Sequence, residues 1–359
     1  MRSVFYFILG VVVVYLLSSC SEDSSSPTEN SDSNYRVVKE IRRNYNQDSE
    51  IWMLNSERTI SYDAYNRIKN DRNYYDSDSY FTNKGFTYDN NSVVIPKGME
   101  YFDGEDDYFS NVSLSYEDGK IKEAIGSQDD GTGVLEETLK SIFTYDGDLL
   151  TRSVQYYKYN GSWIKEFERN WLYLDGRLSE YIINWVEEDE KDKYLYTWEN
   201  DKLIGMTHYV WSSSWEKIYK NVYSYADGKV AEKKEYIIYQ GDWVLNNKSI
   251  YQYDNEYLSS IRTYSEIGSG KSKVSFSYDS KWNYTGFINY IWNEDDNGYI
   301  PSIKQEIVYE EGKGNYEDIN KVLYPEYYYT GLNDVDPDPR VEDEYYKNKG
   351  KNLFSSDRK

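Results

Sequence analysis

Short runs in which aromatic or apolar residues alternate with polar ones fill most of the chain, and each run ends in a turn. The stretch GSWIKEFERNWLYLDGRL (161–178) shows the pattern, with a Trp near the start of an extended run and Asp-Gly at its end. Alternation of this kind predicts a β-strand. Asp-Gly predicts a tight hairpin turn, because both central residues of such a turn take positive φ. The stretch therefore predicts one arm of a β-hairpin.

The same skeleton returns along the chain. An aromatic residue just before a turn, here called an anchor, marks each copy, and successive anchors lie 25 to 31 residues apart. The anchors are Tyr62, Tyr88, Tyr116, Tyr145, Tyr173, Trp198, Tyr225, Tyr253, Tyr278 and Tyr309. A single hairpin is marginally stable in water, so the repeat predicts hairpins that stack on one another.

The fold class expected from this pattern is all-β. About ten antiparallel β-hairpin repeats of about 28 residues each should occupy 36–330, which gives roughly twenty strands. Open twisted sheets rarely exceed ~10 strands. We therefore expect the array to curl into a barrel-like or spiral sheet, or to fold into two packed halves. Charged residues on both faces of the run 163–173 speak against a lipid-facing band, so the sheet should be soluble.

A Trp lies ten residues before several anchors, as in Trp163 and Tyr173. Ten is an even number, so in a regular strand both rings should point to one face. If the Trp residues were exposed in a row they would form a ligand platform, made of Trp163, Trp215 and Trp243. The alternative is that they only cap and cross-pair the sheet. We favour this alternative, because the same positions recur at the repeat spacing.

Composition supports β-structure and argues against one class of partner. The 359 residues include 43 Tyr, 10 Trp and 11 Phe, which suit strands. The formal net charge of −22 is opposite to the cationic surface that a nucleic-acid binder needs. No nucleic-acid partner is expected.

The N-terminus predicts an exported protein. Residues 1–19 have the positive start and the short apolar run of a signal peptide. The run Leu17, Ser18, Ser19, Cys20 resembles the lipobox of bacterial lipoproteins, which implies lipidation of Cys20 and an outer-membrane lipid as partner. An ordinary signal peptide with an incidental cysteine is the alternative. The polar segment 20–35 predicts a disordered tether.

Three acidic or small residues follow the cysteine: Ser21, Glu22 and Asp23. They resemble the surface-export signal of lipoproteins in Bacteroidetes, which implies a cell-surface location. At the other end, 331–359 breaks the repeat and is rich in charge, so we expect a charged tail or cap there.

The runs YDGDL (145–149), YLDGRL (173–178) and YADGKV (225–230) resemble the tyrosine–aspartate repeats of the RHS/YD class. That resemblance implies a β-shell. RHS proteins also carry a self-cleaving core segment, which the sequence lacks, so enclosure of a cargo is not expected here.

Candidate chemistry is sparse. The single histidine, His208, has no nucleophile-elbow sequence beside it, and one Cys with one His serves a transition metal poorly. No metal or cofactor is expected. The function we expect is a non-catalytic binding module for glycan or protein. The alternatives are a structural envelope component that self-associates through its sheet edges and a polysaccharide hydrolase that uses two carboxylates.

Overall fold

The strands form one continuous antiparallel sheet in the computed structural model. The model describes residues 35–76, 80–89, 95–103, 108–129, 133–186, 190–266, 271–280, 283–295 and 297–311. The strands are β1 (Tyr35–Asn46), β2 (Ile51–Tyr62), β3 (Ile68–Tyr75), β4 (Tyr80–Thr87), β5 (Gly98–Asp103), β6 (Tyr108–Glu117), β7 (Lys120–Asp129), β8 (Leu135–Asp146), β9 (Leu149–Tyr159), β10 (Ser162–Leu174), β11 (Arg177–Trp185), β12 (Glu190–Glu199), β13 (Lys202–Trp211), β14 (Trp215–Ala226), β15 (Lys229–Tyr239), β16 (Asp242–Asp254), β17 (Tyr257–Ser265), β18 (Lys271–Tyr278), β19 (Tyr284–Asn293) and β20 (Gly298–Glu311).

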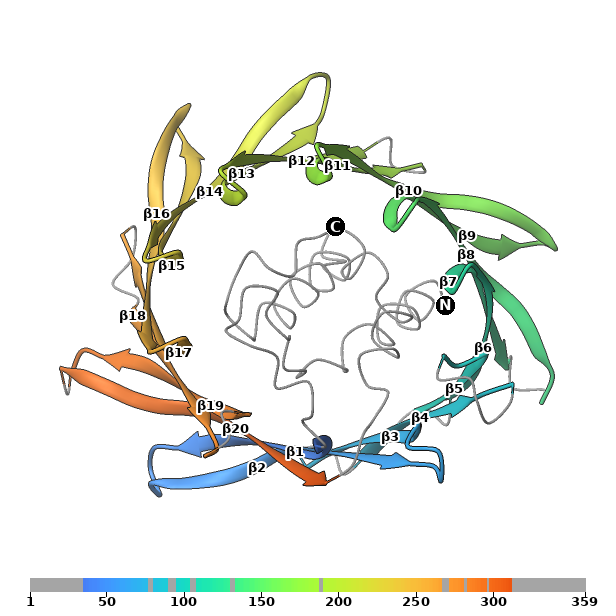
Figure 1. The fold of residues 1–359 in the computed structure, drawn as a ribbon, viewed down its shortest axis with the longest axis horizontal. Coiled ribbons are helices and arrows are strands. Elements are labelled where there is room, and N and C mark those ends of the chain that lie inside the picture. The colour runs from blue at the N-terminus through green and yellow to red at the C-terminus, as the bar shows by residue number, and fades with distance from the viewer. Residues whose placement is uncertain are drawn as a thin grey trace.

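Each strand pairs with the next along the chain, and β20 returns to pair with β1, so the sheet closes into a ring (Figure 1). The all-β antiparallel prediction is confirmed. The architecture is a closed 20-stranded barrel, so the spiral and the two packed halves are wrong. Closure leaves none of the described strands with a free edge.

The tight turns have the predicted backbone. Asp175 and Gly176 have φ of 52° and 77°, and the Asp-Gly pairs at 118–119 and 227–228 also have positive φ at both positions, whereas at 146–147 only Gly147 does. Such turns match the right-handed twist of the flanking strands. The sequence therefore located these hairpin ends correctly.

A β-bulge interrupts the strand that follows the turn at the opposite end of the wall from the Asp-Gly turns, and it makes one prediction wrong. In β10, Trp163 pairs with Lys158 of β9, but beyond the bulged Glu166 it is Phe167 that pairs with Gln155. Their partners on β9, Lys158 and Gln155, are three residues apart, which is an odd number, so Trp163 and Phe167 point to opposite faces. Tyr173 lies on the face of Phe167, so the expectation that Trp163 and Tyr173 share a face is wrong. The same bulge occurs after Trp52, Trp215, Trp243 and Tyr299.

The barrel wall therefore has two distinct faces. We call them the tyrosine face, which carries the anchors, and the tryptophan face, which carries Trp163 and its equivalents. Apart from Val154, the buried apolar side chains lie on the tyrosine face, which forms the core. The side chains around Trp163 on the other face are half-buried or exposed.

The anchors explain the length of the repeat. Nine of the ten donate a hydrogen bond from the ring hydroxyl or indole N–H to a backbone carbonyl 20 to 25 residues earlier. Tyr225, for example, donates to Leu203 over 2.8 Å. Each of these nine anchors therefore joins its own hairpin to the preceding one.

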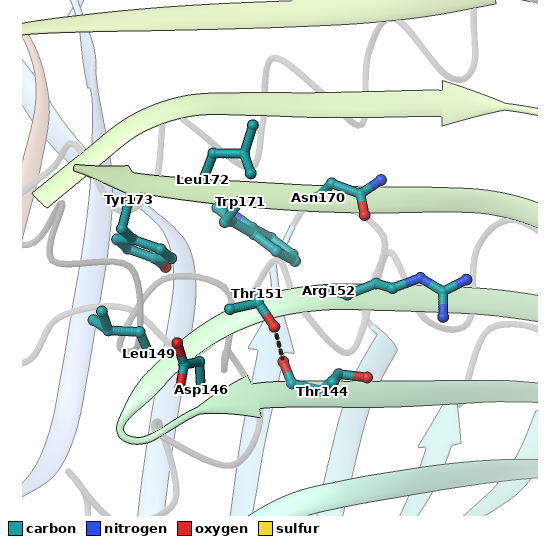
Figure 2. Close-up of a pocket in the computed structure, with 9 residues that line it drawn as sticks. All are labelled: Thr144, Asp146, Leu149, Thr151, Arg152, Asn170, Trp171, Leu172 and Tyr173. Carbon is teal, nitrogen blue, oxygen red and sulfur yellow. Dashed lines mark hydrogen bonds between the residues drawn. The ribbon is translucent and has the colours of Figure 1, made fainter. Parts of the chain in front are cut away.

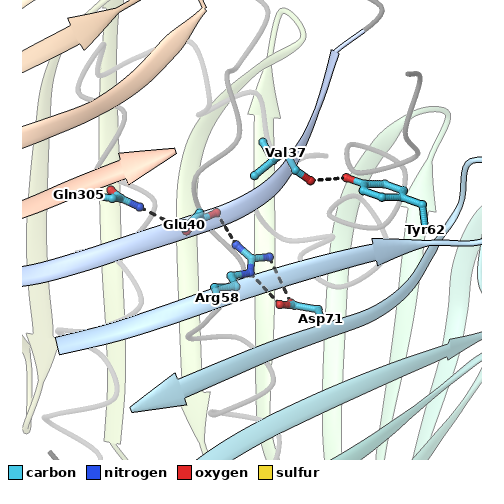
Figure 3. A network of polar contacts seen from close by, with 6 residues as sticks. All are labelled: Val37, Glu40, Arg58, Tyr62, Asp71 and Gln305. Carbon is cyan, nitrogen blue, oxygen red and sulfur yellow. Dashed lines mark hydrogen bonds and ion pairs between the residues drawn. The ribbon is translucent and has the colours of Figure 1, made fainter. Parts of the chain in front are cut away.

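A buried polar network lies where the barrel closes (Figure 3). Arg58 on β2 donates to Asp71 of β3 and, over 2.7 Å, to Glu40 of β1, which also accepts from Gln305 of β20. Lys84 on β4 is the cross-strand neighbour of Asp71 in the register of β3 and β4. Burial lowers the pKa of Lys84 to about 8. Removing Arg58 would leave the buried carboxylates of Glu40 and Asp71 without their shared partner, so the network favours this one closing register.

Candidate functional site

The predicted platform residues lie on one face but are not bare rings. Trp163, Trp215 and Trp243, on β10, β14 and β16, all lie on the tryptophan face and are half-buried. A lysine ammonium from two strands earlier covers each ring. The ammonium-to-centroid distances are 4.7 Å for Lys140 over Trp163, 4.4 Å for Lys193 over Trp215 and 4.8 Å for Lys220 over Trp243.

A tyrosine on the intervening strand completes each group. Lys140 is the direct cross-strand partner of Tyr156 and lies 5.1 Å from its ring centroid. The other two groups repeat this arrangement, with Lys193 at 5.1 Å from Tyr209 and Lys220 at 4.8 Å from Tyr236. We call these the Lys–Tyr–Trp groups. Cation–π contacts of this kind contribute ~0.5–1 kcal/mol each at partly exposed sites.

Two of these groups belong to a larger basic surface. Apart from residues directly beside the tight turns, such as Lys202, Lys229 and Tyr257, the strand register places nine basic residues on the tryptophan face between β12 and β19, and we call this surface the basic strip. Its basic members are Lys191, Lys193, Lys217, Lys220, Lys234, Lys248, Arg262, Lys271 and Lys273. Eight rings lie among them, from Tyr209, Trp211, Trp215, Tyr236, Trp243, Tyr264, Tyr290 and Trp292.

Carboxylates are nearly absent from the basic strip. Apart from Glu199 and Asp254, at the last positions of β12 and β16, the register places one carboxylate among its described residues, Glu232. Lys234 and Lys248 each approach Glu232 to 2.6 Å and lower its pKa. The sequence analysis found the rings but missed these lysines, since their common face depends on the bulges.

His208 lies on the opposite face, within a ladder of rings. It stacks on Tyr194 at 4.4 Å and contacts Tyr219 at 5.0 Å, while its Nε2 is 2.7 Å from an Asp192 oxygen. Its Nδ1 is buried and has no hydrogen-bond partner among the residues that the structure describes. No hydroxyl nucleophile of the described residues therefore hydrogen-bonds to this histidine, and its surroundings are those of a packed side chain.

A shallow hollow of about 450 Å³ lies at the anchor end of β8 to β10 (Figure 2). Its lining residues are Thr144, Asp146, Leu149, Thr151, Arg152, Asn170, Trp171, Leu172 and Tyr173. Arg152 donates to Glu168 over 2.7 Å, and this bond, with a second from Lys165, lowers the pKa of Glu168 to about 2. The lining holds a single carboxyl, that of Asp146, whereas glycoside hydrolysis needs two. The hollow therefore gives the hydrolase alternative no support.

Other predicted features receive no structural test. The lipobox residues, Cys20, the export tripeptide and the tail 331–359 lie outside the described residues. Within the described part of the chain, no group of His, Cys, Asp and Glu side chains could hold a metal ion. None of the described segments is a helix long and apolar enough to cross a membrane.

Comparisons with known proteins give only distant likenesses. No family model matches the chain, and no curated protein matches it. A DUF3836 family protein of Parabacteroides distasonis aligns at 19% identity over 32% of this chain and 86% of its own, with a TM-score of 0.18. A porin-like protein of Bacteroides uniformis aligns at 8% identity over 76% of this chain and 98% of its own, with a TM-score of 0.33. The Photorhabdus luminescens Tc holotoxin pore aligns at 9% identity over 83% of this chain and 17% of its own, with a TM-score of 0.40.

Proposed function

We propose that this chain is a lipid-anchored cell-surface protein that acts as a non-catalytic binding module for a glycan or protein ligand. One observation carries the binding proposal: the Lys–Tyr–Trp groups repeat on the more exposed face of the wall. Aromatic side chains supply large contact area at low entropic cost, and the ammonium groups beside them supply hydrogen-bond donors. The closed barrel holds these groups at fixed spacings.

The lipid anchor is supported by the lipobox-like run that ends at Cys20 and by the acidic tripeptide after it. Self-association through sheet edges, the alternative from a different class, loses the feature it required, because every described strand has two partners. The Tyr-Asp turns keep their resemblance to RHS/YD repeats as further support for a surface shell.

A glycan array and a pull-down from the native envelope test the binding proposal. The matched pair is Lys193→Gln with Lys220→Gln, which alters two groups, and Lys122→Gln, an exposed lysine on β7 outside the basic strip. We expect a ligand that the first variant loses and the control retains. Clean negatives in both screens would refute the proposal, and equal binding by both variants would refute the Lys–Tyr–Trp groups as the binding site.

The anchor is tested separately by labelling with an acyl-chain analogue. Label on the wild type and none on Cys20→Ser is the expected result. Label on both, or on neither, would contradict lipidation at Cys20.

A further inference from the structure

The charge of the basic strip opposes that of the whole protein. The chain carries 63 acidic and 41 basic residues, yet the register gathers nine basic residues on this surface. At physiological ionic strength the Debye length is ~8 Å, so carboxylates farther away are largely screened from a ligand on the strip. An anion close to the strip therefore experiences the lysines more than the net charge.

Two of the lysines are held without an acidic partner. Lys193 and Lys220 form no ion pair with any carboxylate among the described residues, although many other lysines of the chain do. Each ammonium instead lies over two rings. No hydrogen-bond acceptor among the described residues contacts either ammonium, so the N–H donors that do not face the rings remain available to oxygen atoms of a ligand.

The lysines recur at a regular interval across the strands. Within the basic strip, one lysine on each of β12, β14, β16 and β18 directly faces a tyrosine on the next strand. The pairs are Lys193 with Tyr209, Lys220 with Tyr236, Lys248 with Tyr264, and Lys273 with Tyr290. Neighbouring strands lie ~4.8 Å apart, and each lysine is also displaced by two positions, ~6.7 Å, along the strand from the row of the previous one, so positive charges recur about every 12 Å along a line oblique to the strands.

We infer that the basic strip binds a linear polysaccharide that carries carboxylates at regular intervals, laid across the strands from β12 to β19. This rests on the proposed function and names the ligand class for it. A chain with evenly spaced charges engages successive lysines together, and linked contacts of this kind raise the overall affinity well above that of one site. An irregular acidic protein surface would match only part of the interval.

Nucleic acid fits the basic strip less well, although it too is a linear anion. Base stacking requires open ring faces, and lysines cover the rings of Trp215 and Trp243. The strip also contains a single arginine, Arg262, whereas bidentate phosphate recognition favours arginine.

The test measures binding of the purified full chain to alginate, a linear polyuronate, by isothermal titration calorimetry. Dextran serves as the neutral polymer and an oligothymidylate as the nucleic acid. Alginate should bind at 0.15 M salt and be released at 1 M, where the Debye length is ~3 Å. Lys193→Gln and Lys220→Gln should each weaken binding about two- to fivefold, the range of single exposed ion pairs. Lys193→Arg should retain binding, and Lys122→Gln should match the wild type.

The outcomes separate this inference from the proposed function. Binding of dextran, or of a captured protein, with no binding of alginate would overturn the inference and leave the proposed function standing. Tighter binding of the oligothymidylate than of alginate would also overturn it. An alginate affinity unchanged in folded Lys193→Gln and Lys220→Gln would place the ligand elsewhere and refute the strip as its site. No binding of any glycan or protein would refute both.

Discussion

Tyr225→Phe removes one hydroxyl group from the tyrosine face and leaves the ring in place. That hydroxyl donates to the backbone carbonyl of Leu203 over 2.8 Å, and Leu203 is 3% exposed. An intramolecular hydrogen bond contributes ~0.5–1.5 kcal/mol net, and a buried acceptor that loses its donor costs ~1–3 kcal/mol. We therefore expect the free energy of unfolding to fall by about 1.5 kcal/mol.

The assay is equilibrium urea unfolding followed by tryptophan fluorescence and far-UV circular dichroism. The matched control is Tyr239→Phe, because Tyr239 is 60% exposed at the end of β15 and should change stability by less than about 0.5 kcal/mol. Tyr62→Phe, at the closure of the barrel, should resemble Tyr225→Phe, since Tyr62 makes the same bond to Val37. If both anchor variants unfolded at the same urea concentration as the control, the anchor bonds would not be what joins successive hairpins.

Three further changes test the closure of the barrel and its bulged register. Lys84→Met should raise the free energy of unfolding by up to about 3 kcal/mol at pH 7, because burial penalises the charged ammonium of Lys84 in the folded state. The folded-state pKa is about 8, so urea unfolding should show this gain shrinking as pH rises from 8 to about 10.5. Arg58→Met should lower the free energy of unfolding by about 3–5 kcal/mol, because two buried carboxylates lose their partner, while Lys122→Met at an exposed position should change it little. Equal midpoints of thermal unfolding in the two variants would contradict a stabilising role of the network. Gly286→Ala should destabilise the fold by more than about 2 kcal/mol, because Gly286 has a φ of 135° and an added Cβ would fall on a backbone carbonyl of β20. Gly126→Ala, whose Cβ would meet only a side-chain carbon at 3.5 Å, is the control in the same assay, and similar losses of stability in the two variants would refute the argument.

Local signals in the sequence were reliable where the chemistry is local. Asp175 and Gly176 form the predicted turn because few residues other than Asn, Asp and Gly tolerate positive φ there. Trp163 lies near the start of its strand, as predicted, because it follows a turn that its own neighbours define. The candidate rings on the tryptophan face were therefore found from sequence, and their half-buried state lies between the two interpretations offered for them.

The lysines of the site could not be assigned in the same way. Lys193 and Trp215 lie on β12 and β14, which are separated by β13, and they share a face only because both strands pair with β13 in this register. A bulge inserts one residue and exchanges the two faces beyond it, so period-two counting across Glu166 or Ile218 gives the wrong face. The signal available in the sequence was a lysine 22 or 23 residues before each ring, and it becomes informative only once the register is known.

The sequence by itself determined the strands, the tight turns and the anchor spacing, because these depend on backbone preferences and on residues within one hairpin. Only the tertiary structure decided that the sheet closes, which face each ring takes and where the positive charge gathers. Closure depends on the pairing of β1 with β20, whose residues are far apart in the chain and are joined through Glu40 and Gln305. Such contacts depend on the accumulated twist and register of all the intervening strands, and no local pattern specifies that sum.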